Sequence, residues 1–455
     1  MSEQPNIVMV SWDSVRADHM PFHGYERNTA PHVAEMAEDG LVFENTQVSA
    51  VGTPASFTGA FSGKHASATM LNPSPSHWSR SLENERLLPE VLQENGYYTG
   101  GFHFNALMSS HFGWNRGWDV YEDHLWDEKG GNSPTDDEEE DLRAKVYDIL
   151  RDRDLANFAM HAKKSVTGET PVKWEQMWEE INDFVEHAPE PWFLWVLLID
   201  THHPYYAPKE FHEWPQPDVR LTYLWNYVMR RHRSIAGERR QSIINAYDNT
   251  MRYADKFVHR LEKKLDAEGY GDSPFIFHSD HGDELGEHAN YGHRPLMYDT
   301  VTRVPLVMRN VGETGVRKGP HSLLDLGNGI LEIAGIDDWL GEGRSILSHD
   351  RDAVIIQNLL GEEYGRAVAA VGPEWKVLFH PEGDWGHGLS FRGGSWEAYK
   401  HLEDPLEMIN RWGEHPKKLE SLLKDRLERA VVQFDGDSAM DDVTKNRLRE
   451  LGYIE

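Results

Sequence analysis

Four side chains with catalytic potential lie far apart in this chain. Asp13 and the neighbouring pair Asp280 and His281 each follow a short apolar run, and Thr53 begins a run of small residues. Two carboxylates with one imidazole suit Ca²⁺, Mg²⁺ or Mn²⁺, and less specifically Zn²⁺. Such a cation would lower the pKa of the Thr53 hydroxyl, so that its oxygen could attack phosphorus or sulfur. We therefore expect a metal-dependent hydrolase of a charged ester.

A further histidine and a helix start would complete this chemistry. His202 follows another apolar run, and its imidazole could protonate the leaving oxygen as a general acid. A helix that begins at Thr53 would stabilise an alkoxide and the anionic oxygens of the ester. Asp13 or Thr53 taken alone is more commonly a helix cap, so this interpretation depends on the residues acting together.

The composition indicates a folded, cysteine-free protein. The chain has 455 residues, 39% of them hydrophobic, and 16 tryptophans, which is enough for one large domain and a smaller one. Cysteine is absent, so disulfides, thiolate metal sites and a cysteine nucleophile are excluded.

The charge is strongly acidic, with a formal net value of -30. Such a field disfavours nucleic acid and anionic membranes as partners. It also repels a small anionic ester, so we expect a metal and histidines to neutralise the substrate site locally. We interpret the acidic surface as an adaptation to concentrated salt, that is, a halophilic protein, rather than as a site for a cationic ligand.

No segment reads as a signal or a membrane anchor. Residues 1–5 lead into a strand without a basic segment or an apolar signal core. The longest apolar run, 192–199, is far short of the roughly 20 residues that span a bilayer. We expect a soluble cytoplasmic protein.

Strands and helices alternate along most of the chain, which predicts an α/β sheet covered on both faces. Thr29 is expected to cap a helix that starts at Pro31, and Thr170 to cap one over 171–185. Further helices are expected at 87–94, 243–265 and 323–333, and strands at 6–11, 97–102, 193–199, 275–279 and 304–308.

After about Arg344 the pattern changes to short strands separated by turn residues. Strands at 353–357, 366–371 and 375–380 and a last helix at 416–432 predict a smaller antiparallel α+β unit. We place a catalytic domain at 1–345 and the smaller C-terminal unit at 346–455.

The candidate residues follow predicted strands. Loops at the carboxyl ends of strands form the binding sites of open α/β folds. Asp13, His202, Asp280 and His281 all satisfy this placement. They are therefore expected to meet at one edge of the sheet.

Several motifs, in order along residues 6–405, resemble those of sulfatases in the alkaline phosphatase superfamily. The main ones are NIVMVSWDSVRADH at 6–19, TPASFTGAFSG at 53–63, DTHHPY at 200–205 and SDHGDELGEH at 279–288. The resemblance implies an alkaline-phosphatase-like fold, with a mixed, mostly parallel sheet flanked by helices.

The resemblance also implies roles for individual residues. Asp13, Asp280 and His281 would bind the metal together with Thr53, which occupies the nucleophile position. His202 would lie at the leaving group. His293 falls where many members place an anion-contacting lysine.

The nucleophile departs from the sulfatase pattern. The family has cysteine or serine at this position, which is converted to formylglycine, and threonine cannot form that aldehyde. Threonine nucleophiles are familiar in the phosphodiesterase and phosphoethanolamine transferase branches of the superfamily. Thr53 therefore implies a covalent threonyl ester in place of sulfatase turnover through an aldehyde hydrate.

The substrate contacts differ as well. Ser14 replaces a second metal carboxylate, and Phe57, Phe104 and Ala106 fall where basic or imidazole side chains are usual. Asn105 could replace part of the lost anion contact, and Lys64 is another possible anion contact.

Three functions remain open at this point. The leading one is hydrolysis of sulfate or phosphate monoesters or diesters through Thr53. The second is transfer of the bound group to an alcohol, as in a phosphoethanolamine-type transferase, or the related phosphodiesterase activity. The third is a non-catalytic descendant that binds a charged glycan or nucleotide, which the four substituted positions favour.

Overall fold

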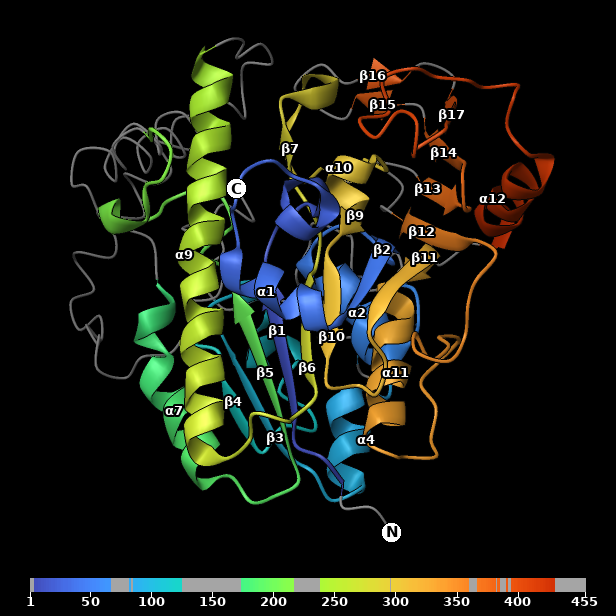
Figure 1. The fold of residues 1–455 in the computed structure, drawn as a ribbon. Helices are drawn as coiled ribbons and strands as arrows, with labels where there is room; N and C mark the ends of the chain where they lie inside the picture. The colour runs from blue at the N-terminus through green and yellow to red at the C-terminus, as the bar shows by residue number, and fades with distance from the viewer. Residues whose placement is uncertain are drawn as a thin grey trace, which may run out of the picture.

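A computed structural model describes residues 4–66, 82, 85–124, 173–216, 238–294, 296–359, 366–381, 383–384, 390–391 and 394–429. In these residues a nine-stranded sheet forms the centre of the molecule, with the strand order β11-β2-β10-β6-β1-β5-β3-β4 and β9 paired to β2 (Figure 1). Its strands are β1 (Ile7–Trp12), β2 (Leu41–Gln47), β3 (Tyr98–His103), β4 (Val120–Glu122), β5 (Trp192–Leu198), β6 (Phe275–Ser279), β9 (Arg303–Val304), β10 (Leu306–Arg309) and β11 (Gly315–Ser322).

The sheet is mixed and mostly parallel. The central strand β1 runs parallel to both β5 and β6. Strand β10 is antiparallel to its neighbours β6 and β2, and β9 is antiparallel to β2. Because the parallel strands end at one edge, the loops after β1, β5 and β6 come together there. The predicted fold class is confirmed.

Helices cover both faces of the sheet, because successive side chains of β1 point to opposite sides. Ile7 and Met9 belong to a core on one face, whereas Val8, Val10 and Trp12 belong to the core on the other. The first core includes α2 (Thr53–Ser62), α4 (Leu88–Glu94) and α11 (Leu326–Ile333). The second includes α1 (Pro31–Asp39), α7 (Trp178–His187) and the long α9 (Glu238–Glu268) (Figure 1).

The N-terminal cap of α1 comes from a different residue than the sequence predicted. The Thr29 hydroxyl donates to the carbonyl oxygen of His19, and no local side chain caps the helix. Instead, Asp255 of α9 accepts the backbone N–H groups of His32 and Val33 at 3.0–3.1 Å. The prediction of Thr29 as the cap was wrong because the carboxylate of Asp255, distant in sequence, accepts the N–H groups that a local cap would accept.

The helix predicted over 171–185 is interrupted. A short 3₁₀ turn, Trp174–Gln176, precedes α7, and Met177 between them has a non-helical ψ of 3°. The apolar positions nevertheless face the core as expected, with Ile181 fully buried. Thr170 and Pro171 lie outside the described residues.

Three strands of the sheet, β2, β4 and β11, were not predicted. β11 is a polar edge strand whose side chains are largely exposed up to Gly319, so it lacks the apolar pattern of a buried strand. It pairs in parallel with β2, with an irregularity between Arg317 and Pro320. Proline is tolerated at such an edge because no partner requires its missing N–H.

A separate antiparallel sheet follows in the C-terminal part, with the strand order β12-β13-β14-β17. The strands are β12 (Val354–Leu359), β13 (Arg366–Val371), β14 (Lys376–His380) and β17 (Ser395–Tyr399), and α12 (Lys417–Arg429) packs on them (Figure 1). The antiparallel pairing is confirmed, whereas the division of the chain at 345 stays a prediction.

A buried lysine joins this C-terminal sheet to the central one. Lys376 of β14 has no exposed side-chain surface, and its ammonium lies 2.6 Å from Asp299 and 3.3 Å from Glu407. Asp299 begins the short helix α10 (Asp299–Thr302), and the carbonyl oxygen of Val301 in this helix accepts the N–H of Gly282 at 2.8 Å. Lys376 thus supports the loop that carries Asp280 and His281.

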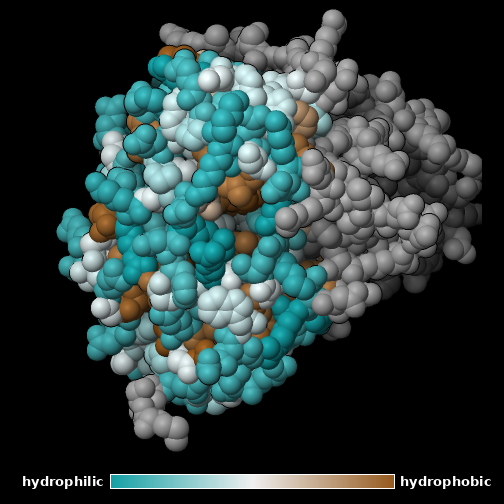
Figure 2. Space-filling view, turned by 90° about the vertical axis from the view of Figure 1, so that its right-hand side faces the viewer, coloured by the Kyte–Doolittle hydropathy of each residue, from teal (hydrophilic) through white to brown (hydrophobic). Residues whose placement is uncertain are grey.

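The described part of the face in Figure 2 is mostly hydrophilic, with hydrophobic residues in small separate groups (Figure 2). Among the described residues, no helix combines the length and the apolar character needed to cross a bilayer. The adaptation to concentrated salt and the cytoplasmic location stay predictions.

Replacing the buried lysine should destabilise the fold strongly. Lys376→Met removes the ammonium and leaves Asp299 as a buried charge without its cation, so we expect a loss of about 3 kcal/mol in the free energy of unfolding. Urea unfolding followed by circular dichroism measures it. In the control Lys418→Met, whose side chain is 71% exposed, the change should stay within about 0.5 kcal/mol. Equal changes in the two variants would contradict this assignment.

Candidate active site

The hydroxyl of Thr53 is positioned by the start of α2. Gly52 precedes the helix with a φ of 94°, a left-handed conformation that glycine adopts without strain, and Thr53 is the first helical residue. The residue before the helix is Gly52, which has no side chain that could cap it. The Thr53 hydroxyl lies 3.4 Å from Nε2 of His281.

The two carboxylates predicted to bind a metal, Asp13 and Asp280, follow adjacent parallel strands. Trp12 at the end of β1 is the register partner of Ser279 at the end of β6. Asp13 and Asp280 are the next residues of the two strands, so both emerge at the same edge of the sheet. This pairing explains how side chains 267 positions apart in the sequence come together.

The side chains of Asp13, Asp280 and His281 converge in a fully buried space. Nε2 of His281 lies 3.6 Å from Oδ1 of Asp13 and 3.5 Å from Oδ2 of Asp280. The three side chains can offer one ligand atom each within 4.8 Å of one another. The structure therefore places the four residues Asp13, Thr53, Asp280 and His281 together, as the sequence predicted.

The electrostatics of this group fit a divalent cation. Burial raises the pKa of Asp13, and the neighbouring Asp280 raises it further, because two carboxylates in a dry site cannot both ionise without a counter-charge. Burial likewise raises the pKa of Asp280. Oδ2 of Asp280 is buried and has no hydrogen-bond partner among the described residues. Hard oxygen ligands in this setting suit Ca²⁺, Mg²⁺ or Mn²⁺.

Ser14 and Asn105 hold the carboxylates in position. The Ser14 hydroxyl donates to Oδ1 of Asp13 at 2.8 Å, and its backbone N–H donates to Asp280 at 3.1 Å. The side-chain amide of Asn105 donates to Oδ2 of Asp13 at 3.1 Å. Asn105, predicted as a substrate contact, therefore borders the site and orients a metal-binding carboxylate.

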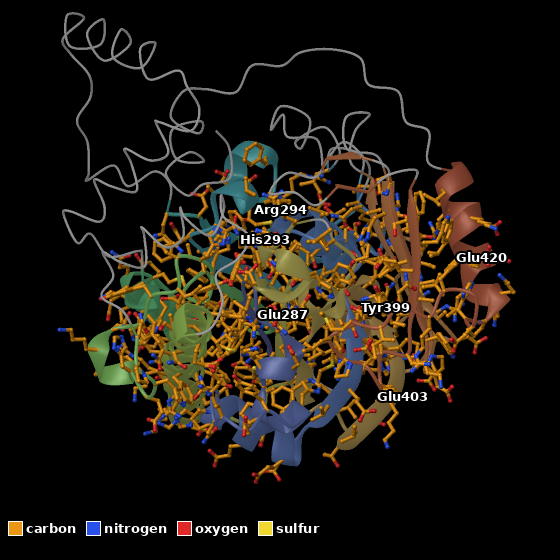
Figure 3. All side chains as sticks on the ribbon, turned by 90° about the horizontal axis from the view of Figure 1, so that it is seen from above. Glu287, His293, Arg294, Tyr399, Glu403 and Glu420 are labelled. Atoms are coloured by element: carbon orange, nitrogen blue, oxygen red, sulfur yellow. The ribbon has the colours of Figure 1, made fainter. Side chains whose placement is uncertain are left out.

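A group of three histidines lies beside the first group. His202 and His203 follow β5, and His293 comes from the segment after β8 (Tyr291–Gly292). Their ligand nitrogens lie within 4.8 Å of one another, and the His293 ring centroid is 4.3 Å from that of His281. Seen from above, His293 and Arg294 lie near the middle of the molecule (Figure 3). His202 and His293 are thus next to the metal-binding group.

The protonation state of His202 bears on its predicted role. Burial lowers the pKa of His202 to about 4, and the attraction of Asp13 only partly offsets this effect. Its imidazole is therefore neutral near pH 7 in the absence of ligands. A substrate anion must stabilise the protonated form if His202 is to act as a general acid.

Lys64 lies away from this group. It follows α2, roughly 15 Å from Thr53 at 1.5 Å per residue, and its ammonium pairs with Glu85 at 2.5 Å. The structure therefore does not bring Lys64 to the candidate site, because the helix carries it to the opposite end. The substituted position Phe57 is packed in the core against Trp195.

The sequence did not identify two residues beside the site, Asp283 and His203. Asp283 is fully buried, accepts the Tyr205 hydroxyl at 2.5 Å and lies 2.8 Å from Nδ1 of His293. His203, which alone reads as a surface histidine, is only 10% exposed in its side chain. Their place in the loops that carry His202 and Asp280 is the signal that could have identified them.

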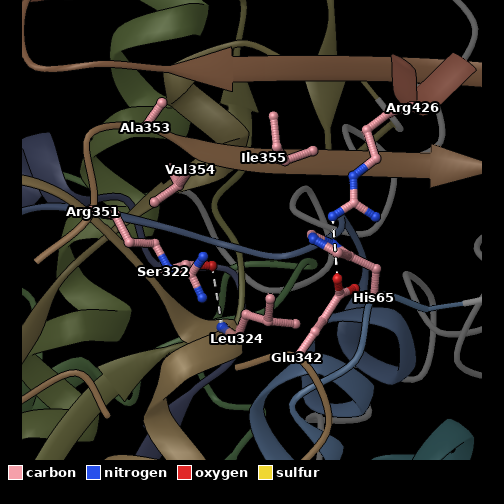
Figure 4. A pocket seen from close by; sticks show the side chains of 9 residues that line it. All are labelled: His65, Ser322, Leu324, Glu342, Arg351, Ala353, Val354, Ile355 and Arg426. Atoms are coloured by element: carbon pink, nitrogen blue, oxygen red, sulfur yellow. Dashed lines mark hydrogen bonds and ion pairs between the residues drawn. The ribbon is translucent and has the colours of Figure 1, made fainter. Parts of the chain in front are cut away.

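A separate cavity lies between the end of α2 and the C-terminal sheet (Figure 4). Its lining residues are His65, Ser322, Leu324, Glu342, Arg351, Ala353, Val354, Ile355 and Arg426. Glu342 and Arg426 pair with each other at 3.2 Å. The cavity has a volume of about 50 Å³, which suits water and is too small for an organic ester.

Comparison with protein families shows which family this chain belongs to. The family model described as Sulfatase matches residues 5–336. The chain belongs to the sulfatase family. A relative from Escherichia coli (strain K12), the uncharacterized sulfatase YidJ, is 23% identical over 364 residues, which cover 74% of this chain and 69% of the relative. Family membership supports ester hydrolysis in general.

Solved structures share the fold of this sulfatase-family protein. One is BT4656 in complex with its substrate D-glucosamine-2-N,6-O-disulfate, with a TM-score of 0.66, 16% identity and coverage of 94% of this chain and 98% of that chain. Another is the phosphonate monoester hydrolase of Agrobacterium radiobacter, with a TM-score of 0.64, 16% identity and coverage of 93% and 95%. At this identity the likeness establishes the fold.

Neutralising one ligand should weaken cation binding. Asp280→Asn removes a charge from a buried site, and such a loss costs about 2–5 kcal/mol, so the affinity for Mn²⁺ should fall roughly 100-fold. Isothermal titration of the chelator-stripped protein with Mn²⁺ measures it. Asp255→Asn, a buried aspartate that accepts backbone N–H groups at α1, is the matched control and should leave the affinity unchanged. Unaltered Mn²⁺ affinity in Asp280→Asn would refute the assignment.

Proposed function

We propose that this sulfatase-family protein is a metal-dependent hydrolase of sulfate or phosphate esters that acts through a covalent intermediate on Thr53. The observation that carries the proposal is the Thr53 hydroxyl, which lies at the first residue of α2 and 3.4 Å from Nε2 of His281. A nucleophile needs this adjacency to the metal-binding group. The substrate is a small anionic ester.

The first step is an in-line attack by Thr53. A divalent cation held by Asp13, Asp280 and His281 would supply Lewis-acid stabilisation of the negative charge on the ester and on the nucleophile. The Thr53 oxygen loses its proton to solvent and bonds to phosphorus or sulfur, while the bond to the leaving oxygen breaks. The N-terminus of α2 adds a positive dipole end at this point. His202, protonated in the presence of the anion, gives its proton to the leaving oxygen.

The second step must release the threonyl ester. The Thr53 carbon bears one oxygen only, so it lacks the second hydroxyl with which a formylglycine hydrate expels its sulfate. Attack by water on phosphorus or sulfur breaks the bond to Thr53 and returns the hydroxyl. His293 is expected to contact the anionic oxygens in both steps.

Transfer of the bound group to an alcohol is the second candidate function, and the single oxygen on the Thr53 carbon favours it as well. Because an external molecule must release the threonyl ester, an alcohol could replace water as the acceptor. In that case the enzyme would act as a phosphoethanolamine-type transferase or as a phosphodiesterase that also transfers its group. The chemistry on Thr53 would be unchanged.

Removal of the nucleophile should abolish turnover without loss of metal binding. We expect Thr53→Ala to lower kcat by roughly 1000-fold or more on chromogenic phosphate and sulfate esters. Thr53→Ser, which keeps a hydroxyl, should retain part of the activity. Mn²⁺ titration should show similar affinity in the wild type and Thr53→Ala. Full activity in Thr53→Ala rules out the mechanism, and an inactive wild type that binds inorganic sulfate or phosphate favours the non-catalytic descendant.

Hydrolysis and transfer can be separated by their products. With water as acceptor, the ratio of released alcohol to inorganic anion stays at one when glycerol or ethanolamine is added. With transfer, the anion falls below the released alcohol and a new ester appears, detectable by phosphorus NMR or mass spectrometry. The wild type and Thr53→Ser are compared, since both carry a nucleophile.

A further inference from the structure

Exposed apolar side chains gather on one segment of the C-terminal unit. Among the described residues, seven large hydrophobic side chains are exposed, and five of them form what we call the 402–412 surface: Leu402, Leu406, Met408, Ile409 and Trp412. The other two, Val316 and Trp339, stand apart from this segment in the sequence. In a chain with a net charge of -30, such a concentration marks an interaction surface. We propose that two copies of this chain form a dimer through the 402–412 surface.

A buried anchor turns the apolar side chains of this segment outward. Glu407 is only 1% exposed and has a left-handed backbone with a φ of 53°. Its carboxylate accepts the backbone N–H of Asp299 and lies 3.3 Å from the ammonium of Lys376. A left-handed residue other than glycine is uncommon and marks a turn that its surroundings impose. Because Glu407 points into the interior, its two neighbours Leu406 and Met408 lie at the surface.

Hydrogen bonds hold the rest of the segment against the C-terminal sheet. The carboxylate of Asp404 accepts the N–H of Ile409 at 2.7 Å. The side-chain oxygen of Asn410 accepts the N–H of Ala398 in β17 at 3.2 Å, and the N–H of Arg411 donates to the carbonyl oxygen of Ala398 at 2.8 Å. The backbone is therefore fixed before a partner binds. Association through it needs little further ordering, which favours affinity.

The charges beside these side chains suit a contact between identical copies. Lys400 pairs with Glu403 at 3.0 Å, and Arg411 pairs with Glu414 at 3.5 Å, so the segment neutralises most of its own charge. Two copies of a chain with a net charge of -30 repel each other over most of their surface. They approach at the least cost where the surface is apolar and nearly neutral. A basic partner would be attracted to the acidic surface instead.

The apolar area is of the size that a dimer contact needs. At 37–62% exposure, the five side chains present together roughly 400–500 Å² of apolar surface. A standard interface buries about 800 Å² on each partner, of which about 56–65% is apolar, or roughly 450–520 Å². In a twofold dimer the same surface is used on both copies, so one such surface on each chain is sufficient.

The 402–412 surface lies away from the candidate active site. Seen from above, Glu403 of this segment lies toward the edge of the molecule, whereas His293 lies near the middle (Figure 3). A dimer formed through this surface therefore leaves the candidate site accessible to a small ester. Association and ester hydrolysis can be tested separately for the same reason.

The molar mass in solution tests the dimer. Sedimentation velocity and light scattering of the full-length wild type at micromolar concentrations should give twice the chain mass of 52.3 kDa, and the dimer should persist in concentrated salt. Ile409→Glu places a charge in the contact and should weaken association by about 100-fold or more. Val316→Glu is the matched control, since Val316 is 59% exposed and Ile409 58%, and it should remain dimeric.

Cross-linking gives a second measurement, because the chain has no cysteine of its own. A bismaleimide should join two copies of Met408→Cys and leave Trp339→Cys as single chains. Thr53→Ala should dimerise as the wild type does, so a failed nucleophile would not affect this result. The proposal is overturned if the wild type has the mass of one chain, or if Ile409→Glu associates as strongly as the wild type. A single chain that binds vesicles of neutral phospholipid would show a lipid-binding surface and would also overturn it.

Discussion

Buried carboxylates that meet at the ends of β1 and β6 are the constraint on which the site depends. Asp13 and Asp280 are fully buried and share one imidazole, His281, between them. Ionised carboxylates in such a place require a positive counter-charge, because water cannot solvate them there. A divalent cation satisfies this requirement, and the only hydroxyl nucleophile proposed for the chain lies at the same point. In the proposed mechanism, binding of a metal and activation of Thr53 would therefore depend on the same group of residues.

The loop that carries Asp280 is supported from the C-terminal sheet as well as from its own strand. Gly282 donates to Val301 of α10, and α10 is held by the ion pair of Asp299 with the buried Lys376. The C-terminal unit thus supports the loop of the candidate site, although none of its described residues belongs to that site. This linkage gives a physical reason for the unit to pack closely against the catalytic part.

Substitutions that set this chain apart from the sulfatase pattern fall into two groups. Ser14 replaces a carboxylate with a hydroxyl that hydrogen-bonds to Asp13, and Asn105, between the substituted Phe104 and Ala106, also donates to Asp13, so the Asp13 carboxylate is held in place. Phe57 contributes an aromatic core contact where a polar contact to the anion is usual. The anion must then rely on metal charge and on the histidines after β5 and β8. In the proposed mechanism, Thr53 in turn requires an external acceptor to release the intermediate.

The sequence by itself determined the α/β order, the strand ends and the types of ligand, because apolar runs and the polar residues that follow them are local features. Asp13, Thr53, Asp280 and His281 were identified in this way. Only the tertiary structure decided which neighbours matter. The register of β1 with β6 brings Asp13 to Asp280, α2 carries Lys64 away, Asp255 replaces Thr29 as a cap, and Asp283 meets His293. These outcomes depend on contacts between residues distant in sequence, and local propensity contains no information about them.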